Sequence, residues 1–408
     1  LTQIFTPSVS CSYMLSHPPI AARRPCQPGT CVRYHPPARG LAQPPTVSMA
    51  GQEAAYVGHL CTVRSRPDPV MSASGILPDN HLKALFDQGV IAADNPPDGA
   101  QIQPASIDLR LGSKAFRLRA SFLPGKNMTV ADRLADDLVM HTVDLSAGAV
   151  LETGCVYLAP LQESLRLPAG LSAAMNPKSS TGRIDVFTRV ITDYGIAFDQ
   201  APLGYEGPLY AEICPRTFSI LAREGDRLSQ IRFRRGAHQT LRDVTVSVDL
   251  AGFENGIVGY RARRHAGLVD LARLGGHASA RFWEPMTAPD RRLVLDPGEF
   301  YILASREAVS IGLDEAAEMA PIAPEIGEFR AHYAGFFDPG FGIAETGGTG
   351  SRAVLEVRGH DVPFMLDHGQ AIARLVYEPM LAPPTAAYGA VASNYQAQGL
   401  KLSKFFAE

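Results

Sequence analysis

The chain matches itself at an offset of 144 residues, and this internal repeat limits the possible folds more than any other feature of the sequence. Seven residues of the first copy recur in the second copy at this single offset. The pairs are Leu151 and Leu295, Gly154 and Gly298, Tyr157 and Tyr301, Met175 and Met319, Pro177 and Pro321, Glu212 and Glu356, and Gly225 and Gly369. Solenoid repeats have units of about 20 to 50 residues, so a period this long indicates two duplicated domains. We place them at residues 71–245 and 246–408.

Short apolar runs bounded by glycine and proline fill both copies. Examples are CVYLAP (155–160) and PLYAEI (208–213) in the first copy, and FYILA (300–304) and AVLEV (353–357) in the second. Closely spaced short strands of this kind are typical of antiparallel sandwiches and barrels. We therefore predict a mainly β protein with two tandem barrel domains and few helices. The best helix candidate is 79–89, with Leu82, Leu85 and Phe86 on one face and Gly89 as its stop.

Residues 1–70 differ from the rest of the chain. They contain eleven of the 32 prolines and six arginines against two acidic residues, and their apolar residues show no helical or strand period. We expect a disordered extension, with Met71 as the natural start. A targeting peptide is the alternative, because the segment contains arginine and is poor in acids.

Charge, hydropathy and cysteine usage exclude several classes of partner. Lys and Arg number 38 against 41 Asp and Glu, and no basic block occurs, so a nucleic-acid partner is not expected. No run approaches the roughly 18 apolar residues of a membrane helix. Beyond the first 70 residues only Cys155 and Cys214 remain, which fits a reducing compartment and predicts a cytoplasmic protein.

Common catalytic motifs are missing from the sequence. It has no G-x-G-x-x-G opening a βαβ unit, no P-loop and no G-x-S-x-G elbow. It also has no C-x-x-C and no H-E-x-x-H, so we expect no zinc site.

Two polar features stand out instead. Lys178, Ser179, Ser180 and Arg183 place two hydroxyls, an ammonium and a guanidinium within six residues, which suits phosphate oxygens. The alternative is a solvated turn. Glu212 lies in a strand-like apolar run, where a partly buried carboxylate can exchange protons near neutral pH, unless it simply faces outward.

The second copy keeps only part of this set. The residues at the offset of 144 from Ser179, Ser180 and Arg183 are Ala323, Pro324 and Gly327, whereas Glu212 is matched by Glu356. If the cluster is a site, the first copy is therefore the active one and the second is scaffold.

In this order, the residues resemble the dCTP deaminase family of the dUTPase-like superfamily. The resemblance covers residues 75–404 and includes a Ser-Ser-x-x-Arg motif in KSSTGR (178–183), Asp199 and the strand glutamate of AEI (211–213). Further matches are QPASIDLRLG (103–112), GCVYLAP (154–160) and the tail YQAQGLKLSK (395–404).

The resemblance implies distorted jelly-roll barrels, assembly of three chains with sites at subunit junctions, and hydrolysis of dCTP to dUTP and ammonia. This reaction supplies a precursor of dTMP. The family's chemistry uses no zinc, and Mg²⁺ would arrive with the nucleotide triphosphate.

The resemblance also implies which residues act in catalysis. Glu212 would be the general base, taking a proton from the water that attacks C4 of cytosine and passing it to the departing amine. Ser179 would orient that water, and Arg183 would hold Glu212 and stabilise the charge of the transition state.

The substrate-binding residues implied in the same way are Lys178, Ser180, Thr192, Asp193, Asp199, Tyr395, Gln398 and Lys401. Lys178 and Ser180 would bind the triphosphate, and Asp199 would lie near the sugar. Thr192 and Asp193 belong to the segment whose backbone reads the base. Tyr395, Gln398 and Lys401 belong to the C-terminal tail, which would close over the phosphates as a lid.

Departures from the family pattern suggest a composite site. The first copy reads DQAPLGYEG (199–207) where the family has Asp-Pro-Gly, whereas the second copy keeps DPGFG (338–342) and carries the tail. We therefore expect chemistry from the first copy and closure from the second. Deleting residues 395–408 should then raise KM for dCTP.

Two other functions remain open at this point. One is a dUTP diphosphatase, or a bifunctional enzyme that carries dCTP through to dUMP, with Asp193 or Asp199 activating a water at the α-phosphate. The other is a catalytically inactive nucleotide-binding barrel.

Overall fold

The structure is a computed structural model that describes residues 74–323, 325, 327, 329–331, 335–346, 350–390, 395–396 and 398–407. The predicted extension over residues 1–70 and the predicted start at Met71 lie outside the described residues. No helix in the described ranges is long and apolar enough to cross a membrane.

The prediction of a mainly β protein with few helices is confirmed. The described chain forms 25 strands but only four short α-helices, which are α1 (Asp79–Asp87), α2 (Val130–Ala135), α3 (Ser179–Gly182) and α4 (Ser279–Phe282). Helix α1 is the one predicted from the sequence. Leu82 and Leu85 are buried, and Gly89 follows the helix with φ of 66°, a conformation that favours glycine.

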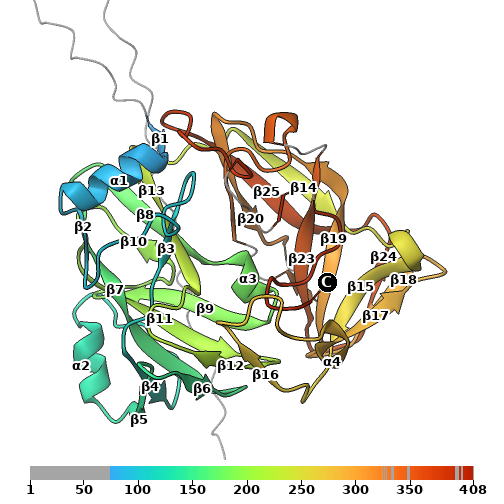
Figure 1. The fold of residues 1–408 in the computed structure, drawn as a ribbon, viewed down its shortest axis with the longest axis horizontal. Helices are drawn as coiled ribbons and strands as arrows, with labels where there is room; N and C mark the ends of the chain where they lie inside the picture. The colour runs from blue at the N-terminus through green and yellow to red at the C-terminus, as the bar shows by residue number, and fades with distance from the viewer. Residues whose placement is uncertain are drawn as a thin grey trace, which may run out of the picture. The chain divides into compact units, whose positions relative to one another are not determined.

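Three sheets occupy the first half of the described chain, which we define as residues 74–241 (Figure 1). One sheet contains β1 (Gly75–Ile76), β3 (Ile107–Leu109), β8 (Leu171–Pro177), β10 (Gln200–Ala201) and β13 (Ser229–Arg235). The next contains β2 (Ile91–Ala93), β4 (Lys114–Leu118), β5 (Val139–Asp144), β7 (Val156–Arg166), β9 (Val186–Thr192) and β11 (Glu206–Pro215). In the smallest, β6 (Ala149–Leu151) and β12 (Ser219–Ala222) pair with β16 (Leu268–Asp270) of the second half.

The second half, residues 242–407, forms the other three sheets. The first of these contains β14 (Arg242–Ser247), β20 (Glu315–Ala320), β22 (Phe336–Phe337) and β25 (Ala371–Pro379). The second contains β15 (Ile257–Ala262), β17 (Trp283–Thr287), β19 (Phe300–Val309), β21 (Phe329–Ala331) and β23 (Ser351–Gly359). In the third, β18 (Arg292–Leu295) pairs with β24 (Phe364–Asp367). Among the described residues the strands thus form six small sheets, without the clear closure into two barrels that we expected.

The central strand pair has the same register in both halves. Glu212 of β11 lies opposite Leu158 of β7, and Glu356 of β23 lies opposite Ile302 of β19, so both members of the pair differ by the repeat offset. A tyrosine contact is also common to the two halves: the hydroxyl of Tyr157 accepts a hydrogen bond from the backbone of residue 152, and that of Tyr301 accepts one from residue 296. The two glutamates therefore occupy equivalent positions.

The halves share a hydrophobic core as well as a polar junction. Trp283, Phe300, Val354 and Phe406 of the second half belong to the same buried cluster as the core of the first half. Burying this apolar area fixes one half against the other, since it stabilises the contact by roughly 25 cal/mol per Å².

Candidate functional site

The Ser-Ser-x-x-Arg motif forms a buried helical turn and not a solvated loop. Strand β8 ends at Pro177, Lys178 precedes α3, and Arg183 follows it. Ser180 and Arg183 are buried, and the hydroxyl of Thr181 donates to the backbone carbonyl of Leu228 at 2.9 Å. In Figure 1, α3 lies between β9 of the first half and β23 of the second.

Arg183 joins the motif to the C-terminal tail. Its guanidinium donates to Oε1 of Gln398 at 3.1 Å and to the backbone carbonyl of Lys401 at 3.0 Å, and it lies 3.9 Å from the ring centre of Tyr395. The structure therefore brings the three predicted tail residues to the predicted arginine.

The end of the tail is docked into the protein. The hydroxyl of Ser403 donates to the carbonyl of Ser180 at 2.8 Å, and the backbone N–H of Lys404 donates to the hydroxyl of Tyr395 at 3.3 Å. The ring of Phe406 is buried next to Trp283, with 5.7 Å between the ring centres. The tail is thus held at both its middle and its end.

Glu356 of β23 is the carboxylate that faces the motif. The residue is 1% exposed, and a Cβ placed on Gly182 would lie 1.9 Å from its Oε2. Neither carboxylate oxygen of Glu356, nor Nε of Arg183, has a hydrogen-bond partner among the described residues. Burial raises the pKa of Glu356 well above its ordinary value, while the charge of Arg183 opposes this rise.

Glu212 has a different partner from the one predicted. Its carboxylate accepts from Nε of Arg189 at 3.1 Å, and Arg189 lies directly opposite it on β9. The guanidinium of Arg189 also donates to the hydroxyl of Ser121 at 2.9 Å and stacks on the ring of Phe198 at 3.5 Å. Arg183 does not pair with Glu212 in the described structure, because its contacts go to the second half.

Thr192, Asp193 and Asp199 lie at or beyond the end of β9, the strand that pairs with the strand of Glu212. Thr192 is buried at the end of β9, and Oδ1 of Asp193 accepts from the backbone N–H of Val130 at 2.7 Å. Oδ1 of Asp199 accepts from the backbone N–H of Val190 at 2.7 Å. Burial raises the pKa of Asp199 to about 7, and the nearby Glu212 carboxylate adds to this rise. The predicted site residues thus form two groups, one around Arg183 and one around Glu212.

A cationic cluster next to α3 joins the predicted Lys178 to Arg227 and Lys404, which the sequence reasoning missed. Lys178 forms an ion pair with Asp108, and NH1 of Arg227 lies 3.9 Å from the same carboxylate. Lys404 is close to these charges, and burial lowers its pKa. The lysines of KSSTGR and KLSK and the aspartate of ASIDLRLG were visible in the sequence, but nothing local indicated that they meet.

The Asp-Pro-Gly segment of the second half lies against the first half. Arg232 is fully buried and donates to Oδ1 of Asp338 at 2.9 Å and to the carbonyl of Phe337 at 3.2 Å. A Cβ on Gly335 would lie 3.3 Å from the backbone nitrogen of Ser179. The segment before the DPGFG motif therefore approaches the Ser-Ser-x-x-Arg motif.

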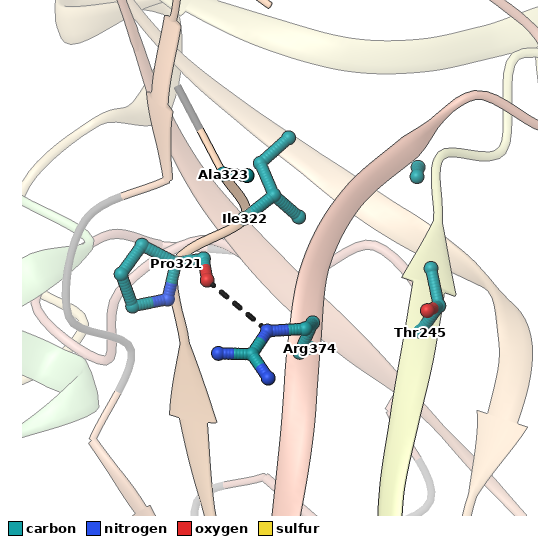
Figure 2. Close-up of a pocket in the computed structure, with 6 residues that line it drawn as sticks. Thr245, Pro321, Ile322, Ala323 and Arg374 are labelled. Carbon is teal, nitrogen blue, oxygen red and sulfur yellow. Dashed lines mark hydrogen bonds between the residues drawn. The ribbon is translucent and has the colours of Figure 1, made fainter. Parts of the chain in front are cut away.

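A pocket of about 420 Å³ lies in the second half at the position that corresponds to α3 (Figure 2). It is lined by Thr245, Pro321, Ile322, Ala323, Ala371 and Arg374. Nε of Arg374 donates to the carbonyl of Pro321 at 3.4 Å. Since Ala323 replaces Ser179 here, the pocket lacks the hydroxyls of the first copy.

The described residues contain no cluster of three or more His, Cys, Asp or Glu suited to holding a metal ion.

Comparisons with known proteins identify the family. The family model of the 2'-deoxycytidine 5'-triphosphate deaminase N-terminal domain matches residues 73–237, and that of the C-terminal domain of the same family matches residues 219–406. A dUMP-forming dCTP deaminase of Methanobrevibacter smithii is 29% identical over 162 residues, which are 39% of this chain and 79% of that protein. A dCTP deaminase of Haloarcula marismortui is 27% identical over 161 residues, again 39% of this chain and 79% of that protein.

A solved structure extends the match to both halves. The crystal structure of 2'-deoxycytidine 5'-triphosphate deaminase from Agrobacterium tumefaciens is 55% identical, with a TM-score of 0.73, and the match covers 76% of this chain and 99% of that one. The two overlapping family-model matches and this similarity over almost the whole length of a solved relative show that the chain belongs to the dCTP deaminase family.

Proposed function

We propose that this chain hydrolyses dCTP to dUTP and ammonia at the junction of α3, β23 and the C-terminal tail. The observation that carries the proposal is the carboxylate of Glu356, which is buried beside Arg183 with both oxygens free of hydrogen bonds. A group in this state can accept a proton from water and return it. The names of the relatives support dCTP as the substrate.

Glu356 is the better candidate for the general base than Glu212, which we predicted from the sequence. The carboxylate of Glu212 is already held in an ion pair by the guanidinium of Arg189, which occupies one of its oxygens. Glu356 instead faces Arg183, as the family resemblance requires of the base.

The reaction then proceeds by proton transfers. Glu356 takes a proton from water as the water oxygen bonds to C4 of cytosine, and Arg183 stabilises the developing charge. Glu356 passes this proton to the amino group, and ammonia leaves as the C4–N bond breaks. The second water proton moves from the C4 hydroxyl to N3 as the C4 carbonyl forms. Ser179 orients the attacking water.

The triphosphate would bind at the cationic side of the cluster. Lys178, Ser180, Arg227 and Lys404 offer donors there, and Mg²⁺ would enter bound to the nucleotide. The tail would complete this triphosphate site with Gln398, Lys401 and Tyr395. Thr192, Asp193 and Asp199 would belong to the alternative in which Glu212 is the base, because they lie on or beyond β9, which pairs with the strand of Glu212.

The second candidate function is a bifunctional reaction that ends at dUMP. Several relatives, including that of Methanobrevibacter smithii, carry the name "dUMP-forming". In this case dUTP would be hydrolysed further to dUMP and pyrophosphate, so the two candidates differ in the product that accumulates.

The test is a comparison of Glu356→Gln with the matched variant Glu212→Gln. With dCTP and Mg²⁺ we expect the unaltered protein to release ammonia together with dUTP, or with dUMP and pyrophosphate if it is bifunctional. Glu356→Gln should lower kcat by a factor of about 10² to 10⁴, since general acid–base catalysis contributes about this much. Glu212→Gln should stay within a few fold of the unaltered protein.

Two outcomes would contradict the proposal. A severe loss of ammonia release in Glu212→Gln, together with an active Glu356→Gln protein, would mean that Glu212 of the first half is the general base. No ammonia from the folded, unaltered protein would favour a diphosphatase, if dUTP is cleaved, or an inactive nucleotide-binding protein, if it is not.

We further propose that residues 71–245 and 246–408 are duplicated barrel domains of a cytoplasmic protein that assembles as three chains. The equal register of the two strand pairs supports the duplication.

A further inference from the structure

A second pair of charges crosses the junction next to Arg183 and Glu356. Asp185, two residues after Arg183, forms an ion pair with Arg358, two residues after Glu356. Asp185 is 3% exposed, and its carboxylate also accepts from the hydroxyl of Thr217 at 2.5 Å. Arg183 of the first half thus faces Glu356 of the second half, and Asp185 of the first half pairs with Arg358 of the second half.

The geometry connects this ion pair to Glu356. Residues two apart on a strand point to the same face, so Arg358 and Glu356 both project from β23 toward the first half. Arg358 also donates to the hydroxyl of Thr217 at 3.0 Å. Asp185 has a φ of 55°, a left-handed conformation that few residues other than glycine adopt, directly after the turn that carries Arg183.

The ion pair belongs to this junction and not to the repeated fold. At the offset of 144, Asp185 corresponds to Phe329 and Arg358 corresponds to Cys214, so neither charge recurs in the other copy. A pair inherited with the fold would have counterparts in both copies. Its presence only beside the cluster of Arg183 and Glu356 points to a role in that cluster.

We propose that Asp185 and Arg358 form a clamp that positions Glu356 against Arg183 for catalysis. The inference rests on the proposed function, in which Glu356 is the general base. Both are positioning residues, because they act through Glu356 and Arg183. A shift of about 1 Å in a reacting group can cost about 10² in rate, so even a small relaxation of the clamp should lower kcat.

The charges around Glu356 give the clamp a distinctive pH signature. The groups that face Glu356 are Arg183 and Asp185, and Asp185 is faced in turn by Arg358 and Arg216. The negative charge of Asp185 favours the neutral form of Glu356. Asp185→Asn removes this charge and should lower the pKa of Glu356. In Arg358→Gln the buried Asp185 loses the cation that lowers its own pKa, so it should be protonated near neutral pH and the pKa of Glu356 should fall in this variant too.

The experiment measures kcat and KM for dCTP across pH in the full chain, for the unaltered protein and for both single variants. We expect each variant to lower kcat about tenfold or more, with a smaller change in KM. The acidic limb of kcat/KM should move to lower pH in both Asp185→Asn and Arg358→Gln, by about one unit. Arg358→Lys should restore part of kcat, and Arg292→Gln, at an exposed ion pair, is the matched control.

Thermal unfolding of each variant separates positioning from loss of fold. If a single variant does not fold, the double variant Asp185→Asn with Arg358→Gln removes both charges, and it should fold with lowered kcat and an acidic limb shifted as in Asp185→Asn. An acidic limb that does not move, or that moves to higher pH, in Asp185→Asn would overturn the clamp. An inactive unaltered protein or an active Glu356→Gln would instead overturn the proposed function.

Discussion

At the scale of residues, two glutamates in equivalent positions have different surroundings. Glu212 and Glu356 hold the same register on equivalent strands, but Glu212 faces an arginine of its own half and Glu356 faces one of the other half. The sequence reasoning found the Ser-Ser-x-x-Arg motif and a strand glutamate. It could not tell which glutamate the arginine meets, because that depends on how the halves pack.

Two buried aspartates make stability depend on pH. Burial raises the pKa of Asp185 to about 6 and that of Asp199 to about 7. The folded protein therefore holds protons between about pH 4 and pH 7 that the unfolded chain has released. The two groups stabilise the folded protein fully below about pH 4, and this stabilisation is lost as the pH rises to 7. The loss is about 1.4 kcal/mol for each pH unit between the pKa of a group in the unfolded chain and its pKa in the folded protein.

Asp199→Asn should flatten this dependence, measured as the free energy of unfolding in urea from pH 4 to pH 8. Asp270→Asn is the control of opposite sign, because hydrogen bonds from Arg223 lower the pKa of Asp270. That variant should lose stability near neutral pH and lose less in acid. An unchanged slope in Asp199→Asn would show that Asp199 titrates at its ordinary pKa in the folded protein.

At the scale of elements, the C-terminal segment is part of the core. Phe405 and Phe406 are buried with the core of the first half, and the ring centre of Phe406 lies 5.3 Å from that of Phe282. The sequence predicted that the tail closes the site, but its aromatic end gave no periodic signal of burial. Deletion of residues 395–408 would remove core side chains together with the binding residues, so point variants separate the two effects better.

Phe406→Ala should lower the free energy of unfolding by about 3 to 5 kcal/mol, because it leaves a cavity among packed aromatic rings. It should also raise KM for dCTP, since the tail then loses its anchor next to Arg183. Leu274→Ala is the control, because Leu274 is 64% exposed and such changes stay within about 0.5 kcal/mol. A Phe406→Ala protein as stable as this control would mean that the segment is not anchored by its ring.

At the scale of the whole molecule, one chain brings together the motif, the carboxylate and the tail. Arg183 comes from the first half, whereas Glu356 and Gln398 come from the second. The repeat offset predicted the equivalence of the strands, and the Asp-Pro-Gly of the second copy suggested a shared site. The sequence could not show that the first copy's motif meets the second copy's glutamate, because a contact between duplicated domains leaves no local pattern.

A mixture of two inactive variants tests whether the site is contained in one chain. Glu356→Gln and Arg183→Met each remove one partner, so co-expressed chains should show no more ammonia release than either variant alone. The two co-expressed chains should be purified together through different tags. Recovered activity in the mixed assemblies would mean that Arg183 acts with a glutamate of a neighbouring chain.

The pocket lined by Pro321 and Ala323 has a consequence for the history of the gene. It lies where the second copy would carry its own motif, and the described contacts place the first copy's motif, not this one, at Glu356. Mutations at this position after duplication therefore did not touch the reacting groups. Selection was thus relaxed on the motif of the second copy. The second copy has lost the motif, whereas the first copy keeps it but lacks the Asp-Pro-Gly and the tail. This division makes the duplication irreversible, because neither copy alone carries all of these parts.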